Sequence, residues 1–202
     1  MALVVVTGGA RSGKSRAAQQ LAESRQREGQ PVVVAVFASE SDAEMTERIA
    51  RHRADRPAGF AVVEASGTAS WIAVVPADSL LLLDCVGTWL GRAMLEVWAA
   101  TAPTGADMSD AAELPEAFAG QFEARVAELV DALASRTGDT IVVTNEAGSG
   151  VVPAFASGRI FRDELGRANA ALIGIADAAY LAVAGRLLDI SALPRKIHWP
   201  ED

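Results

Sequence analysis

The sequence has few lysines, one cysteine and little aromatic character. Its 202 residues contain a single cysteine, Cys85, so no disulfide can form within the chain. No apolar run approaches the length of about 18 residues expected of a membrane-spanning helix. The formal net charge of −8 argues against nucleic acid bound over a broad basic surface, because phosphate contacts need clustered Lys and Arg. The first residues enter an apolar stretch without the charged region of a signal peptide. We therefore expect a cytoplasmic protein with no membrane span and no nucleic-acid partner.

Hydrophobic residues make up half of the chain, and they recur in short runs separated by helical patterns. Near-continuous apolar runs predict strands that are covered on both faces, over Leu3–Thr7, Val32–Ala38, Leu80–Asp84, Thr140–Asn145 and Ala179–Val183. Helical spacing predicts helices over Lys14–Glu28, Asp42–Arg53, Thr88–Ala99, Glu116–Arg136 and Phe155–Ile175, with a weaker one around Thr68–Val74. This alternation is typical of an α/β fold with a mostly parallel sheet flanked by helices.

The organisation of the chain indicates a single domain over residues 1–202. The stretch TAPTGADMSDAAEL, residues 101–114, has few large apolar residues and is expected to be a surface loop inserted between two helices. The tail after Gly185 is expected to pack loosely.

The stretch VVTGGARSGKSRAA, near the start, is the most informative motif. An apolar strand pattern breaks into glycines and then becomes helical, and Gly8, four residues and then Gly13-Lys14-Ser15 fit the phosphate-binding loop pattern. Backbone N–H groups of such a loop form an anion nest at a helix N-terminus. The predicted nucleotide-binding residues here are Gly8, Gly9, Ala10, Arg11, Ser12, Gly13, Lys14 and Ser15. The alternative is a glycine-rich turn in which Lys-Ser occurs by chance.

Lysine usage supports the motif. The chain has only two lysines, Lys14 and Lys196, and one of them stands where the loop needs a compact positive charge. Arginine, which is planar and forked, substitutes poorly in a narrow loop. Lys14 is therefore predicted to be catalytic and to reach the β- and γ-phosphates, and the Ser15 hydroxyl to ligate Mg²⁺.

A carboxylate at the end of another strand usually organises the metal in such sites. In SLLLLDC, four leucines lead to Asp84, which is predicted to hold Mg²⁺ and contact the nucleotide. Glu146, after VVTN, is a second candidate: one of the two carboxylates could hold the metal through water while the other orients a substrate hydroxyl. The alternative for Asp84 is a residue that only ends the strand or caps the next helix.

One of the two histidines, His52, has an unusual setting. Ser41 and Glu44 have capping-box spacing, so a helix is expected from Asp42, with His52 on the same face as two apolar residues. The arginines around it, which would favour a neutral imidazole and attract a polyphosphate, are Arg48, Arg51, Arg53 and Arg56. The alternative is a surface histidine in a solvated basic patch. His198, in the tail, is taken as incidental.

Four stretches together resemble a known family, the bifunctional adenosylcobinamide kinase / adenosylcobinamide-phosphate guanylyltransferases of cobalamin biosynthesis. They occur in matching order and cover most of the chain: VTGGARSGKSRAA, DAEMTERIARHRADRP, LLLLDCVGTWL and IVVTNEAGSGVVPAFASGRIFRDELGRANAALIGIADAAYLAVAG. The loop VFASES and the position of Phe60 depart from the family pattern, as do residues 101–114 and the longer tail.

The resemblance implies a RecA-like P-loop fold, a homotrimer and two reactions. A nucleoside triphosphate, GTP or possibly ATP, phosphorylates the aminopropanol hydroxyl of adenosylcobinamide, and GMP is then transferred from GTP through a guanylylated histidine. His52 matches that histidine, and the covalent step divides one hard transfer into two easier ones. The resemblance also implies nucleotide contacts at Ala38, Ser39, Arg53, Arg56 and Glu64.

Two other function classes stay open at this point. A small-molecule kinase would use the phosphate loop and leave His52 idle. A nucleotide-dependent switch would use the loop without small-molecule chemistry, and the His-Arg cluster would then have no role.

Overall fold

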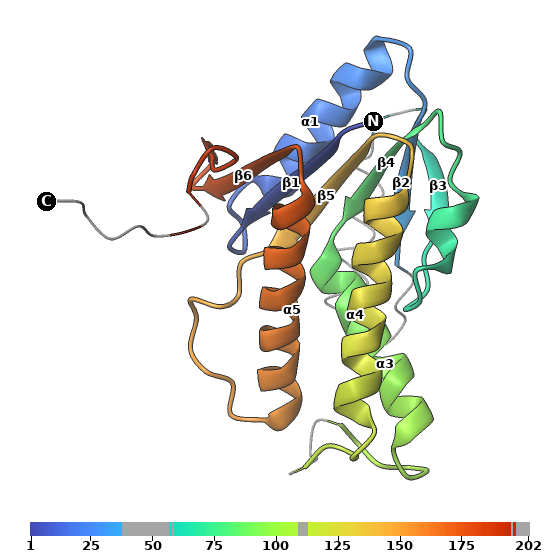
Figure 1. The fold of residues 1–202 in the computed structure, drawn as a ribbon, viewed down its shortest axis with the longest axis vertical. Helices are drawn as coiled ribbons and strands as arrows, with labels where there is room; N and C mark the ends of the chain where they lie inside the picture. Colours follow the sequence, from blue (N-terminus) through green and yellow to red (C-terminus); the bar gives the residue numbers. More distant parts are fainter. Residues whose placement is uncertain (38–56, 58, 109–112, 195, 197–202) are drawn as a thin grey trace, which may run out of the picture.

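The computed structural model describes residues 1–37, 57, 59–108, 113–194 and 196. Within these ranges the chain forms a seven-stranded sheet with helices on both faces (Figure 1). The strands are β1 (Leu3–Gly8), β2 (Val32–Val36), β3 (Ala61–Glu64), β4 (Leu80–Asp84), β5 (Thr140–Asn145), β6 (Ala178–Val183) and β7 (Arg186–Asp189). The helices are α1 (Lys14–Arg27), the 3-10 helix η1 (Ser70–Val74), α3 (Val86–Thr101), α4 (Phe118–Ser135) and α5 (Ala156–Ile175).

The strand order is β3-β2-β4-β5-β1-β6-β7. All neighbouring pairs from β3 to β6 are parallel, and only β7 pairs antiparallel, with β6. The carboxyl ends of the parallel strands therefore meet at one edge, which is where ligands bind in open α/β sheets. β5 separates β1 from β4, so the strand before the glycine-rich loop and the strand that ends at Asp84 are not neighbours. The P-loop fold with a mostly parallel, helix-flanked sheet is the one predicted.

Alternating side chains of the strands fill two apolar layers, one on each face of the sheet. On one face Val6, Leu82 and Val143 pack with Ala18 and Ala22 of α1. The other face supports the larger layer, in which α3, α4 and α5 bury their apolar stripes (Figure 1). Its largest fully buried side chains on the helices are Trp89, Phe118, Phe122, Leu90, Leu129, Leu165 and Leu172. Because both faces are covered, the central strands are apolar at nearly every position, as their sequences indicate.

Five predicted strands are confirmed, at β1, β2, β4, β5 and β6. β3 and β7 were not predicted, because both are short and mostly exposed edge strands whose sequences lack the pattern of buried strands. The helix expected around Thr68–Val74 is a 3-10 helix over Ser70–Val74. The helix expected over Asp42–Arg53 lies outside the described residues.

Two other regions bear on the organisation expected from the sequence. Between α3 and α4, Met108 and Leu114 pack against the core, and residues 109–112 lie outside the described part. After Gly185, where the sequence predicts only a loosely packed tail, β7 pairs with β6 through the register Val183↔Arg186. A single domain over the whole chain stays a prediction. None of the helices described combines the length and the apolar character needed to cross a membrane.

Candidate active site

The first strand ends in a loop that leads directly into the first long helix. β1 ends at Gly8 and α1 begins at Lys14, so the glycine-rich motif lies between a buried strand and a helix N-terminus. A Cβ on Gly8 would lie 2.5 Å from the carbonyl oxygen of Ala182, so only glycine fits there. The loop closes on itself through a 3.3 Å hydrogen bond from the Ser12 N–H to the Gly9 carbonyl. This is the local structure expected of a phosphate-binding loop.

The loop has an exposed tip and a buried base. Gly9, Ala10 and Arg11 are exposed, whereas Ser12 and Lys14 are buried. The Ser12 hydroxyl has no hydrogen-bond partner among the described residues. An open tip above buried polar groups suits a polyphosphate, which needs many donors and brings its own negative charge.

Lys14 is 7% exposed, which is unusual for a lysine. Its ammonium donates a 3.1 Å hydrogen bond to the Gly9 carbonyl and forms no ion pair with a carboxylate in the part of the chain that the structure describes. A carbonyl compensates a buried positive charge only partly. The Lys14 ammonium therefore lies against its own loop, at a place where it would stabilise an anionic ligand.

Ser15 and Asp84 are 69 residues apart in the sequence and meet at the carboxyl edge of the sheet. The Ser15 hydroxyl, in the first turn of α1, donates a 3.1 Å hydrogen bond to Asp84 Oδ1, at the end of β4. The two residues predicted as metal ligands are thus brought together beside the loop. A hydroxyl and a carboxylate are hard oxygen donors of the kind that Mg²⁺ takes.

Glu146, the alternative carboxylate, is held differently. Its backbone N–H donates to the Gly8 carbonyl at 3.0 Å, so the residue lies beside the loop. Its carboxylate, however, accepts hydrogen bonds from the Ser149 N–H (2.9 Å) and hydroxyl (3.1 Å). Of the two carboxylates, Asp84 is the one that is hydrogen-bonded to the predicted ligand Ser15.

Neighbouring polar groups that sequence reasoning did not single out support this edge of the sheet. The Asn169 amide of α5 donates to the Asn145 carbonyl at 2.9 Å and accepts from the Thr144 hydroxyl at 2.5 Å, which ties α5 to the end of β5. Asn169 is 7% exposed. In the sequence, the signal that could have identified it is an asparagine among the small apolar residues of GRANAAL. Buried polar groups of this kind need partners, and here they fix the strand end.

Cys85 follows Asp84 directly and is a free thiol. Burial raises its pKa, and the adjacent Asp84 carboxylate raises it further. The thiol lies 3.4 Å from the Thr88 hydroxyl and 3.9 Å from the Asn145 amide. A thiol with a raised pKa stays protonated, so Cys85 is a poor nucleophile.

The remaining predicted residues are distributed along or beyond this edge. Glu64 is exposed at the end of β3, four strand spacings or about 19 Å from β1 across the sheet. It shares the carboxyl edge with the loop but does not touch it. The other predicted residues lie outside the described residues: Ala38, Ser39, His52, Arg53 and Arg56.

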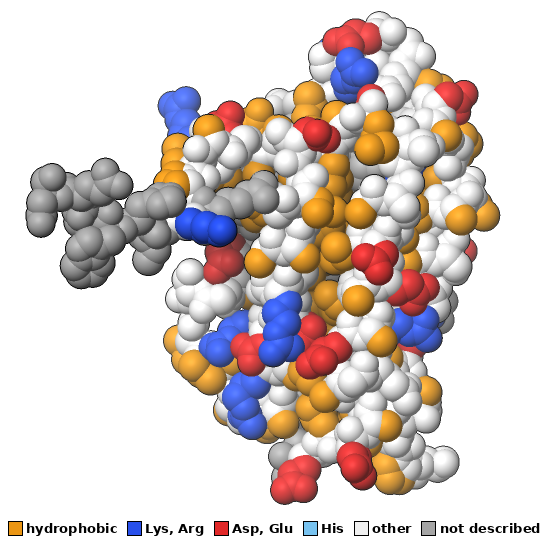
Figure 2. Space-filling view, in the orientation of Figure 1, with side chains coloured by type: hydrophobic (Ala, Val, Ile, Leu, Met, Phe, Trp, Pro, Cys, Tyr) orange, Lys and Arg blue, Asp and Glu red, His pale blue; other side chains and the backbone are white. Residues whose placement is uncertain are grey.

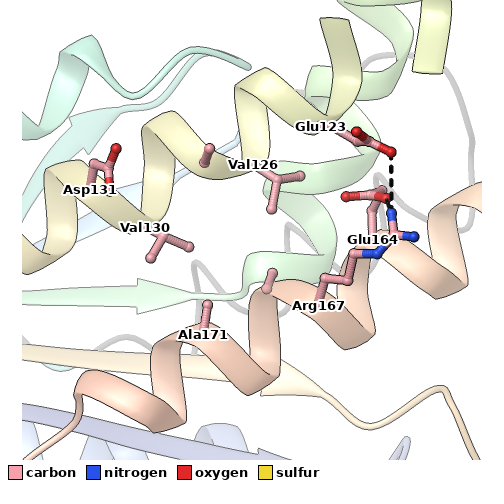
Figure 3. Close-up of a pocket in the computed structure, with 9 residues that line it drawn as sticks. Glu123, Val126, Val130, Asp131, Glu164, Arg167 and Ala171 are labelled. Atoms are coloured by element: carbon pink, nitrogen blue, oxygen red, sulfur yellow. Dashed lines mark hydrogen bonds and ion pairs between the residues drawn. The ribbon is translucent and has the colours of Figure 1, made fainter. Parts of the chain in front are cut away.

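A separate groove lies on the outer face of the helix layer, between α4 and α5 (Figure 3). Val126, Val130 and Ala171 line it, and Glu164 lies buried at its base, where Arg167 pairs with it and with Glu123. Every residue that lines the groove comes from these two helices. Charged side chains of both signs are interspersed over this face (Figure 2). The groove is therefore formed by these two helices alone, and none of the predicted site residues lines it.

Comparison with known proteins agrees with this geometry. Residues 4–190 match the model of the family described as cobinamide kinase / cobinamide phosphate guanyltransferase. The chain belongs to this family. It is 32% identical over 192 residues to the bifunctional adenosylcobalamin biosynthesis protein CobP of Pseudomonas aeruginosa, covering 94% of this chain and 98% of that protein.

Two further relatives carry the name bifunctional adenosylcobalamin biosynthesis protein CobU. The protein from Salmonella typhimurium is 32% identical over 186 residues, covering 91% of this chain and 96% of the relative. The protein from Escherichia coli is 31% identical over 185 residues, with the same two coverages. The family match includes the phosphate loop, β4 with Asp84, and the segment that contains His52.

Proposed function

We propose that this chain phosphorylates the aminopropanol hydroxyl of adenosylcobinamide and then transfers GMP from GTP to the new phosphate, giving adenosylcobinamide-GDP. The observation that carries the proposal is the contact between Ser15 and Asp84 beside the glycine-rich loop, in a chain that belongs to the cobinamide kinase / cobinamide phosphate guanyltransferase family. The family supports nucleotide and cobinamide substrates. The choice of GTP or ATP as the kinase donor stays open.

In the kinase step, the loop N–H groups and Lys14 would hold the β- and γ-phosphates. The hydroxyl oxygen attacks the γ-phosphorus and releases its proton to solvent, the bond from that phosphorus to the bridging oxygen breaks, and the nucleoside diphosphate leaves. Because Lys14 is buried and only partly compensated by the Gly9 carbonyl, it is well placed to stabilise negative charge on the oxygens of the transferred group.

Mg²⁺ fits the donor set at the Ser15–Asp84 pair. Magnesium sites usually combine one or two protein oxygens with substrate phosphates and waters. No cluster of three or more His, Cys, Asp or Glu side chains suited to a metal occurs among the described residues, so a site built by the protein alone is not supported there. When bound, the ion would neutralise phosphate charge, with Ser15 and Asp84 holding it.

In the transfer step, His52 would attack the α-phosphorus of GTP and release pyrophosphate, leaving GMP on the imidazole as a phosphoramidate. The phosphate of adenosylcobinamide phosphate would then attack the same phosphorus and free the histidine. Arg53 and Arg56 would bind the nucleotide phosphates, and Ala38, Ser39 and Glu64 would contact the rest of the nucleotide. These roles rest on the sequence, since all but Glu64 lie outside the described residues.

The experiment that tests the proposal separates the two reactions. Incubation with GTP labelled on the α-phosphate should give acid-labile, base-stable label on the wild-type protein. His52→Ala should lose this label and the guanylyl transfer while keeping phosphorylation of adenosylcobinamide. The matched control is His198→Ala, which removes the only other histidine and should keep both activities.

The outcomes distinguish the alternatives. Guanylyl transfer by His52→Ala would end the covalent hypothesis. Wild-type protein that phosphorylates the substrate without ever carrying the label would be a kinase alone. Nucleotide hydrolysis without either transfer would indicate a switch.

The assembly and the surroundings of the protein are further parts of the proposal. We propose a homotrimer in the cytoplasm, without a nucleic-acid partner. Light scattering at several concentrations would show a mass about three times the 21.0 kDa of the chain. A constant monomer mass would remove the trimer from the proposal without affecting the chemistry.

A further inference from the structure

The β6–β7 hairpin and the phosphate loop emerge side by side at the carboxyl edge of the sheet. β6 pairs in parallel with β1, with Ala182 opposite Gly8. The hairpin turn, Ala184–Gly185, therefore follows β6 at the level where the loop follows β1. Both turn residues have positive φ, 49° and 78°, the combination found in tight hairpin turns of type I′.

The turn touches the loop through backbone atoms. The Gly185 N–H donates a 2.9 Å hydrogen bond to the Ser12 carbonyl. A Cβ built on Gly13 would lie only 3.3 Å from the Gly185 Cα, so the two backbones are in close contact. The hairpin thus backs the base of the loop on the side of β6, whereas Ser15 and Asp84 lie on the side of β4 and β5.

This hydrogen bond determines how the peptide group between Ser12 and Gly13 is oriented. A peptide group is planar and trans, so its C=O and its N–H point in opposite directions. When Gly185 holds the Ser12 carbonyl against the hairpin, the N–H of Gly13 is turned away from the hairpin. An anion nest requires its N–H groups to converge on the ligand before the ligand arrives. A rotated Ser12–Gly13 peptide would present a carbonyl oxygen to a phosphate instead.

We propose that the β6–β7 turn is a positioning element, in which Gly185 presets the Gly13 N–H for binding nucleotide phosphate. The inference rests on one part of the proposed function, namely that the loop binds a nucleotide. It adds a residue from the far end of the chain to the nucleotide site, 172 positions after Gly13. Gly185 acts through the loop and does not itself contact the reacting atoms.

The chain offers a matched pair of glycines for the test. Gly185 and Gly29 both have positive φ, 78° and 94°, and a Cβ on either would meet nothing within 4 Å. Alanine at either position therefore costs backbone strain without a clash, and the two costs should be similar. Gly29 lies beyond the far end of α1. This helix has 14 residues and is about 21 Å long, so Gly29 is well separated from the loop.

The experiment measures the Kd of a non-hydrolysable GTP analogue by calorimetry and the thermal midpoint of each variant. Gly185→Ala and Gly29→Ala should lower the midpoint by similar amounts. Only Gly185→Ala should weaken nucleotide binding, because the strain at its positive φ shifts the turn and moves the N–H of residue 185 away from the Ser12 carbonyl. The expected loss is roughly 5- to 10-fold, the cost of about one hydrogen bond to the loop. In the kinase assay its KM for the nucleotide should rise while its KM for cobinamide does not change.

A second variant keeps the test informative if Gly185→Ala folds poorly. Ala184→Asn places a residue that tolerates positive φ before Gly185, and Asn-Gly favours this turn. It should raise the thermal midpoint and lower the nucleotide Kd, because a more rigid turn holds the Ser12 carbonyl more firmly. A raised midpoint with an unchanged or higher Kd would overturn the inference.

Three further results would overturn the inference. If the wild type binds the nucleotide and Gly185→Ala binds it equally well, the inference about the turn is overturned while the proposed function stands. Equal loss of affinity in Gly29→Ala and Gly185→Ala would show that general destabilisation is the cause. Wild-type protein that binds no nucleotide would overturn both this inference and the proposed function.

Discussion

Two buried charged side chains in this molecule differ in the partners that surround them. Lys14, at the phosphate loop, is 7% exposed and donates to a carbonyl of its own loop. Glu164, below the groove between α4 and α5, is 2% exposed and is paired with Arg167, which also reaches Glu123 (Figure 3). Among the described residues, the first charge has a carbonyl as its hydrogen-bond partner, and the second has an ion-pair partner.

The difference teaches which of the two sites is prepared for a ligand. A buried charge without a full counter-charge has a desolvation cost that an anionic ligand can offset. A buried charge that is already paired has no such need. The groove between α4 and α5 therefore holds a structural ion pair, and we propose that the chemistry takes place at the carboxyl edge.

Lys14→Ala tests the first half of this comparison and should have the largest effect. We expect kinase turnover at saturating nucleotide to fall at least about 100-fold, because the charge that stabilises the transferred phosphoryl group is gone. The thermal midpoint should fall little, since no ion pair with a described residue is broken. Lys196→Ala, at the chain's only other lysine, is the control and should retain normal turnover. Normal turnover in Lys14→Ala would remove the loop from the mechanism.

Asp84→Asn should have the next largest effect. The substitution keeps a hydrogen-bond partner for Ser15 and removes the negative charge, so we expect Mg²⁺-dependent turnover to fall roughly 10- to 100-fold. A titration of activity against Mg²⁺ should show a higher requirement, with a nearly unchanged circular dichroism spectrum. Glu146→Gln is the comparison variant. A larger shift in Mg²⁺ dependence for Glu146→Gln than for Asp84→Asn would transfer the metal role to Glu146.

Glu164→Gln tests the second half of the comparison, through stability. Burial raises the pKa of Glu164, while Arg167 opposes that rise and Glu123 and Asp163 add to it. A carboxyl whose pKa is higher in the folded than in the unfolded state destabilises the fold when ionised. This penalty is absent below the unfolded pKa, grows as pH rises from the unfolded to the folded pKa, and is fully present above the folded pKa.

The glutamine variant cannot ionise, so its advantage in free energy of unfolding over the wild type should grow with pH across that window. Denaturant unfolding at several pH values measures this, and we expect a difference of about 1 kcal/mol or less at neutral pH. Arg167 is exposed enough to stay solvated when its partner becomes neutral. Kinase turnover should stay within about twofold of the wild type. A pH-independent loss of stability would mean that the ion pair itself stabilises the fold.

Cys85 should show the smallest effect. It lies beside Asp84, but its raised pKa keeps it as an uncharged thiol. A thiol-specific reagent at pH 8 should react with the native protein roughly tenfold or more slowly than with the urea-unfolded chain. Cys85→Ser should keep normal kinase activity. Rapid labelling of the native protein, or loss of activity in the serine variant, would place a reactive thiol in the nucleotide site.

The sequence alone determined the features whose signals are local. The order of strand, glycine-rich loop and helix is encoded in adjacent residues, so the position of the loop between β1 and α1 was predictable. Five strands were predictable because burial on both faces makes them apolar throughout. The weakly patterned edge strands β3 and β7 were not, because their residues are mostly exposed and no local period marks them.

The tertiary structure alone decided which distant residues meet. Both Asp84 and Glu146 follow apolar strands, and only the order β4-β5-β1 and the contact with Ser15 distinguish them. The hydrogen bond from Gly185 to Ser12 is likewise absent from any local pattern, because it depends on the register of β6 against β1. The physical reason is that hydrogen bonds between strands are made by backbone groups, which are alike in every residue. Local sequence can therefore specify that a strand forms, while packing of the whole sheet decides which strands become neighbours and which loops share an edge.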